Sequence, residues 1–159
     1  PTMMQKTFGM SPSHTFALSA LGIVFLNIGC VLAGLLVDRI GAWRAVLVYS
    51  LLLPVGIAVL YASLIAGGVW LGAAYAIAGL SCGVVGAVPS VMVSLFPAPV
   101  RVSGISFTYN IAYALWASTT PLMLIALMPT SPWICVFYCV VMGAVGVASA
   151  LRFSRRPVF

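Results

Sequence analysis

Charged residues are almost absent from this sequence of 159 residues: they make up 5% of it, whereas hydrophobic residues make up 64%. Soluble domains carry about a quarter charged residues, which cover the surface that faces water. A water-soluble surface cannot be built from so few. The composition therefore excludes a soluble globular domain and indicates a membrane protein.

Acidic residues are the scarcest of all. Asp38 is the only one, beside seven Lys and Arg and one His, so the formal net charge is +6. In a soluble protein this excess of base would suggest nucleic acid as a partner. Here the basic residues stand at the ends of apolar runs, and no basic face with interleaved aromatic residues exists. We therefore exclude nucleic acid and take the basic residues as an orientation signal for a lipid bilayer.

Groups that perform catalysis or bind metals are missing from the apolar runs. No Asp, Glu, Lys, Arg or His lies inside them, and the one histidine, His14, precedes the first run. The cysteines all lie inside the runs, without CxxC spacing, and are interpreted as packing residues: Cys30, Cys82, Cys135 and Cys139. We expect no metal, no bound cofactor and no enzymatic activity, because no run holds a nucleophile beside a base.

Two uncharged stretches, residues 45–100 and 102–151, determine the number of helices. Each is long enough to cross a bilayer twice, since one crossing takes about 20 residues. Turn-forming residues at 66–68 and 128–132 divide them, and the alternating pattern of barrel strands is absent. The sequence thus predicts an all-α fold, a polytopic bundle of five transmembrane helices. It has an outer loop 1–14, helices at about 15–37, 44–66, 69–95, 104–127 and 132–152, and a cytoplasmic tail 153–159.

The basic residues lie mainly on one side of these helices. Lys6 is alone on one side, and the other side carries Arg39, Arg44, Arg101, Arg152, Arg155 and Arg156. The side rich in arginine is cytoplasmic under the positive-inside rule, so the protein is expected in the cell (inner) membrane with its N-terminus outside and its C-terminus in the cytoplasm. Because many transporters are built from helix repeats, the odd number of helices predicts a piece of a longer protein.

The segment after the first helix, residues 34–44, reads GLLVDRIGAWR and resembles the signature loop of the major facilitator superfamily. The matching residues are Gly34, Leu36, Asp38, Arg39, Gly41 and Arg44, whereas Ala42 and Trp43 depart from the pattern. Gly34 permits close helix approach, Gly41 permits a positive φ, and Asp38 can cap the next helix. A role for this loop in gating, together with Arg101, and a role as a plain structural cap are both open.

A longer segment, residues 89–121, reads PSVMVSLFPAPVRVSGISFTYNIAYALWASTTP. Its Leu-Phe-Pro at 95–97, Arg101 and Tyr109-Asn110 are similar to the metabolite:proton symporter family, which includes proline/betaine, citrate, 2-oxoglutarate and shikimate carriers. The resemblance implies that these are helices eight to twelve of a twelve-helix carrier. It also implies that the partners are a small organic solute, a proton and the missing N-terminal helices, which would hold the proton-coupling carboxylate.

Neutral polar and aromatic residues inside the spans are the candidates for a substrate cavity, since polar groups in lipid must face protein or water. The candidates are Asn27, Tyr109, Asn110, Tyr113, Trp116 and Thr120. Asn110, Tyr113 and Thr120 recur at helical spacing and are predicted to share one face. The alternative is that these residues only join helices through hydrogen bonds.

Small residues recur along the third predicted helix at Ala76, Gly79, Gly83 and Gly86, which predicts a face that another helix can approach closely. Pro89 follows and is expected to kink this helix. Two functions from different classes remain open. One is a proton-coupled carrier of an organic acid or a betaine-like solute, and the other is a five-helix scaffold or subunit that does not transport.

Overall fold

The computed structural model describes residues 4–5, 9–127, 131 and 133–153. Within these ranges it has no strand, and five helices are long and apolar enough to cross a membrane, which confirms the predicted all-α membrane bundle. The predicted tail beyond residue 153, the turn residues 128–130 and 132, and Lys6, Arg155 and Arg156 lie outside the described residues. The elements are α2 (Pro12–Ile40), α3 (Ala42–Ile65), α4 (Leu71–Ser81), α5 (Val84–Leu95), a 3-10 turn η1 (Ala98–Val100), α6 (Arg101–Leu127) and α7 (Ile134–Phe153).

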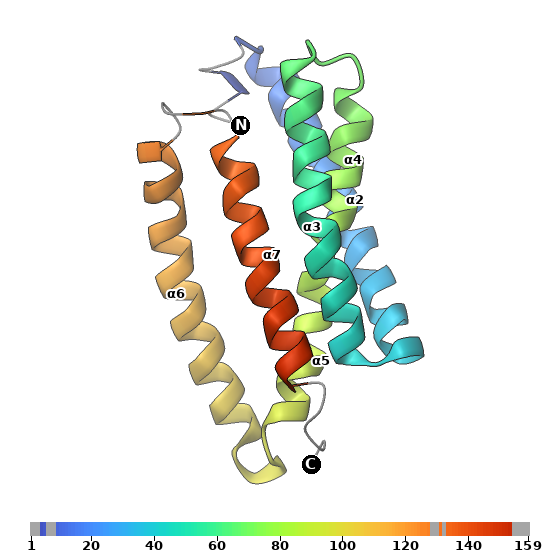
Figure 1. Ribbon diagram of the computed structural model, residues 1–159, viewed down its shortest axis with the longest axis vertical. Coiled ribbons are helices and arrows are strands. Elements are labelled where there is room, and N and C mark those ends of the chain that lie inside the picture. The colour runs from blue at the N-terminus through green and yellow to red at the C-terminus, as the bar shows by residue number, and fades with distance from the viewer. Residues whose placement is uncertain (1–3, 6–8, 128–130, 132, 154–159) are drawn as a thin grey trace.

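Four of the spans form a packed group, and α6 stands beside it (Figure 1). α4 and α5 together make one span, which packs against both α2 and α3, while α7 lies along the far side of α3. α6 makes few contacts with the other helices, and most of them are with η1, α5 and α7. None of its residues is buried, although it is 27 residues long.

Glycines bring α2 and the α4–α5 span into backbone contact. A Cβ atom added at Gly29 would lie 2.6 Å from the carbonyl oxygen of Leu80, and one added at Gly86 would lie 2.5 Å from that of Cys30. Close approach without side chains is the usual way in which membrane helices gain packing energy. The hydroxyl of Tyr49 on α3 donates a buried hydrogen bond of 3.1 Å to the carbonyl oxygen of Gly29 and so joins a third helix to this contact.

The third span is interrupted at Cys82 and Gly83, between α4 and α5. There the backbone winds more tightly: the amide of Gly83 donates to Leu80 and that of Gly86 to Gly83, each three residues back. The sequence predicts a kink at Pro89, which lies inside α5, whereas the interruption at Cys82 and Gly83 is not predicted. The tight turn lies where Gly83 packs against α2 and the ring of Tyr49. This contact joins residues that are far apart in the sequence, so the sequence alone does not reveal it.

A single residue, Gly41, joins α2 to α3. Its φ of 90° and ψ of 154° fall in a region that only glycine adopts readily, as the sequence predicted for a tight corner. Two other expectations for this corner are wrong. Asp38 does not cap α3, whose first turn has no side-chain cap, because α2 continues to Ile40 and keeps Asp38 inside its last turn. Gly34 mediates no close approach, since a Cβ atom there would meet nothing within 4 Å.

Candidate functional site

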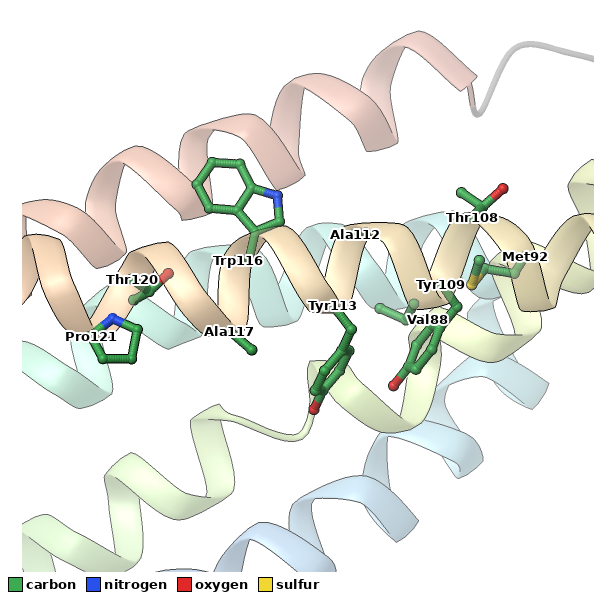
Figure 2. Close-up of a pocket in the computed structure, with 10 residues that line it drawn as sticks. All are labelled: Val88, Met92, Thr108, Tyr109, Ala112, Tyr113, Trp116, Ala117, Thr120 and Pro121. Atoms are coloured by element: carbon green, nitrogen blue, oxygen red, sulfur yellow. The ribbon is translucent and has the colours of Figure 1, made fainter.

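A cavity of about 670 Å³ lies between α5 and the central part of α6 (Figure 2). Ligand pockets in proteins typically have volumes of about 300–1,000 Å³, so the size suits a small organic molecule. The cavity is lined from α5 by Val88 and Met92, and from α6 by Thr108, Tyr109, Ala112, Tyr113, Trp116, Ala117, Thr120 and Pro121. α6 supplies most of this lining because its residues four apart fall on neighbouring turns of one side of the helix.

Aromatic rings are the largest groups at this cavity. Tyr109 and Tyr113 extend from the same side of α6, and their rings stack with centroids 5.2 Å apart and planes 29° apart. Trp116 extends from α6 in another direction, toward α7 in the view of Figure 2. Between them, Ala112 and Ala117 are small and leave the space open. The cavity therefore offers ring faces and hydroxyl groups.

A hydrogen bond joins α6 to α7 at Thr120, one of the lining residues. The hydroxyl groups of Thr120 on α6 and Tyr138 on α7 lie 2.8 Å apart. α6 and α7 otherwise touch little, so this bond is a specific link between them. The sequence predicts Thr120 as a cavity residue but gives no sign of Tyr138, because pairing across helices depends on how the two helices are rotated and shifted.

The two predicted asparagines lie away from the cavity lining. The amide of Asn110 donates to the carbonyl oxygen of Ser106 at 2.7 Å, and that of Asn27 on α2 donates to Ile23 at 2.8 Å. Both side chains are exposed on the surface of their helices. Each amide keeps a second N–H group and acceptor capacity for another partner. Of the predicted cavity residues, the structure thus brings together Tyr109, Tyr113, Trp116 and Thr120. Asn27 and Asn110 do not line the cavity.

Polar groups also occur on the outer surface of α6. The hydroxyl of Ser118 donates to Ala114 at 2.7 Å and that of Thr119 to Leu115 at 2.6 Å, both within the helix. These internal bonds lower the cost of placing hydroxyl groups in a bilayer. Together with the exposed Asn110 they make α6 a poor surface for lipid tails, so this face suits contact with protein or with a water-filled cavity.

The residues predicted for gating fall into two local groups. Asp38, Arg39 and Arg44 are exposed around the Gly41 corner. Arg101 is half-buried at the start of α6, where its Nε atom donates to the carbonyl oxygen of Phe96 at 3.1 Å.

The ring of Phe96 in turn lies against Gly104, where a Cβ atom would be 2.5 Å from Cδ1 of the ring. Arg101 therefore fixes the connection between α5 and α6, the two helices that line the cavity.

Charged side chains are absent from the lining of the cavity. Among the residues that the structure describes, three or more His, Cys, Asp or Glu side chains do not gather anywhere in a way that could hold a metal ion. The arrangement can bind a molecule through ring faces, a thioether and hydroxyl groups.

Comparison with known proteins identifies no relative: no family model, no curated protein and no solved structure matches this chain. The function of the chain is therefore inferred from its own geometry and from the motif resemblance of residues 34–44 and 89–121.

Proposed function

We propose that this chain is the C-terminal portion of a multi-pass carrier of the cell (inner) membrane, which moves a small organic solute by proton-coupled symport with alternating access. One observation carries the proposal, the cavity of about 670 Å³ between α5 and α6. It lies along the middle of a membrane span, and substrate sites of secondary transporters lie near the bilayer midplane.

The exposed polar face of α6 supports a partner inside the membrane. A span that buries none of its residues and carries Asn110, Ser118 and Thr119 on its surface is costly to leave in lipid. Asn27 extends the same argument to α2, where it is exposed near the middle of the helix. In the proposal, the N-terminal helices of the same carrier cover these faces and enclose the cavity.

The location of the proton site follows from charge. Titratable Asp, Glu, Lys, Arg and His side chains are missing from the interior of the spans in this sequence, and proton coupling needs such a group within the membrane. The coupling carboxylate therefore belongs to the N-terminal helices. The motif resemblance of residues 34–44 and 89–121 to the major facilitator superfamily and its metabolite:proton symporters agrees with this division.

Uptake into proteoliposomes tests the proposal. The full-length gene product is reconstituted, a pH gradient is imposed, and uptake of radiolabelled organic acids and betaines is measured. Trp116→Ala should lower uptake about tenfold or more, because loss of an aromatic contact worth about 1.4 kcal/mol corresponds to that factor. Ile111→Ala is the matched control, since Ile111 is exposed on the same helix and does not line the cavity.

Two outcomes contradict the proposal. If no solute enters in response to the pH gradient, the chain is better described as the non-transporting scaffold or subunit. If Trp116→Ala and Ile111→Ala lower uptake only in proportion to the amount of protein in the membrane, the cavity is not the route of the solute.

A further inference from the structure

Three spans contain a proline inside a helix: Pro54 in α3, Pro89 in α5 and Pro121 in α6. Proline has no amide hydrogen, so the carbonyl oxygen four residues earlier loses its helical donor. In a membrane a polar group without a partner is costly, and a neighbouring helix, a side chain or a water molecule usually satisfies it. The surroundings of each freed oxygen therefore indicate what can bind to it.

On α3, another helix packs against the freed oxygen. Pro54 frees the carbonyl oxygen of Ser50, and a Cβ atom added at Gly143 of α7 would lie 2.6 Å from this oxygen. At such close contacts the Cα–H groups of the neighbouring backbone bond weakly to a carbonyl oxygen. The oxygen of Ser50 is therefore used in packing within the bundle.

On α6, the freed oxygen belongs to a residue of the cavity lining. Pro121 frees the carbonyl oxygen of Ala117, and both residues line the α5–α6 cavity. In Figure 2 they lie on the side of α6 from which Tyr113 extends. A helical carbonyl points along the axis toward the residue four positions on, so this oxygen lies between Ala117 and Pro121 at the cavity wall.

The hydroxyl groups that follow this carbonyl in the sequence are engaged elsewhere. Ser118 and Thr119 donate to carbonyl groups of the preceding turn, and Thr120 is paired with Tyr138. α6 also buries none of its residues, so its backbone is not covered as that of α3 is. The described part of the chain thus leaves the oxygen of Ala117 as an open acceptor at the cavity wall.

We propose that the carbonyl oxygen of Ala117 is a binding subsite of the cavity, which accepts a hydrogen bond from an O–H or N–H group of the bound molecule. The inference rests on the proposed function for its biological role, since that molecule would be the solute. The subsite does not decide the charge of the solute. It assigns to Pro121 the role of exposing an acceptor in a wall that is otherwise mainly apolar.

Two pairs of probes test the inference on the full-length gene product in lipid nanodiscs. Phenol and fluorobenzene have nearly the same shape, but only phenol has an O–H donor. Indole and benzofuran differ in the same way by an N–H donor. Aromatic probes suit the rings that line the cavity. Binding is measured by equilibrium dialysis, and uptake by empty nanodiscs of the same lipid is subtracted.

Pro121→Ala restores the amide hydrogen and so occupies the oxygen of Ala117. The affinities for phenol and indole should fall about 2- to 10-fold, as for the loss of one hydrogen bond, whereas those for fluorobenzene and benzofuran should not change. A fall for phenol alone or for indole alone would assign the subsite to O–H or to N–H donors.

Pro89→Ala is the matched control, because it restores an amide hydrogen in α5 and Pro89 does not line the cavity. It should leave the affinities for all four probes unchanged. Equal changes for all four probes in Pro121→Ala, no change for any of them, or the same fall in Pro89→Ala would overturn the inference.

Thr120→Val separates the backbone carbonyl from the hydroxyl group beside it. This variant retains Pro121, so the preference for phenol over fluorobenzene should remain. Loss of the preference would assign the acceptor to the hydroxyl of Thr120 and overturn the assignment to Ala117.

The binding and uptake experiments separate the two proposals. A preference for donors that depends on Pro121, without uptake in proteoliposomes, would support the subsite and contradict the carrier function. Uptake that responds to the pH gradient, without such a preference, would support the carrier and overturn the subsite.

Discussion

Two glycines of α2, Gly29 and Gly34, look alike in the sequence and differ in the structure. Gly29 is buried against Leu80 of α4, whereas a Cβ atom at Gly34 would meet nothing within 4 Å. The sequence of residues 34–44 predicts a close approach at Gly34, yet the close approach occurs at Gly29. Which glycine faces a neighbour depends on the rotation of α2 about its axis, and a helix that is apolar on all sides gives no sign of it.

Gly29→Ala should destabilise the protein by about 1–3 kcal/mol, because the added methyl group forces α2 and α4 apart. Gly34→Ala is the matched control on the same helix, and it should be neutral or stabilise by about 0.5–1 kcal/mol, since alanine favours the helix. Unfolding in mixed micelles with increasing SDS, followed by circular dichroism, measures both. Equal effects of the two substitutions would contradict the packing described for Gly29.

Gly41 tests a different residue property, its backbone conformation. Gly41→Ala should cost about 1–3 kcal/mol, because φ of 90° with ψ of 154° is strained for any residue that has a Cβ atom. There is space for the methyl group, since nothing lies within 4 Å of it. The same SDS titration measures the loss, and an unchanged midpoint would show that the corner relaxes without strain.

Among the helices, α6 has the fewest contacts with the rest of the chain, so its link to α7 can be examined by itself. Thr120→Val and Tyr138→Phe, made singly and together, form a double-mutant cycle across the hydrogen bond of 2.8 Å. A coupling energy of about 0.6–1.7 kcal/mol is expected, as for other hydrogen bonds between membrane helices. Ser118→Ala with Tyr138→Phe should show no coupling, because Ser118 bonds only within α6. Coupling of the same size in both cycles would contradict the link.

Some features of the α4–α5 span can be predicted from the sequence, and others cannot. The recurring small residues predicted a face that another helix can approach closely, and this is confirmed at Gly79, Gly83 and Gly86, where the neighbour is α2. A kink was expected at Pro89 because proline lacks the amide hydrogen that would bond within the helix. No residue type in the sequence indicates the interruption at Cys82 and Gly83. It lies where Gly83 contacts α2 and Tyr49.

For the whole molecule, five spans could be predicted because bilayer thickness fixes helix length and uncharged stretches are visible in the sequence. Much of the cavity lining could also be predicted, as Tyr109, Tyr113, Trp116 and Thr120 lie on one helix with regular spacing. The contributions of Val88 and Met92 could not, because they depend on how α5 and α6 are placed side by side.

The orientation of the molecule can be tested by labelling. In a variant without its four cysteines, single cysteines are introduced at Ser13, Val69 and Ala98, which are all exposed. The positive-inside rule predicts that a maleimide that cannot cross the membrane labels positions 13 and 69 from outside intact cells. Position 98 should react only after the membrane is opened. Labelling of position 98 in intact cells would reverse the proposed orientation.

The exposed surface of α6 has a consequence for the synthesis of the protein. Of the five spans, α6 is the least apolar, and it is the one with no buried residue. The free energy with which a helix passes from the insertion machinery into lipid depends on its hydrophobicity. This free energy is therefore least favourable for α6 when it inserts alone. Its release into the bilayer is therefore expected to depend on the helices that are already present there. Insertion and assembly of this part of the chain would then be one event during translation.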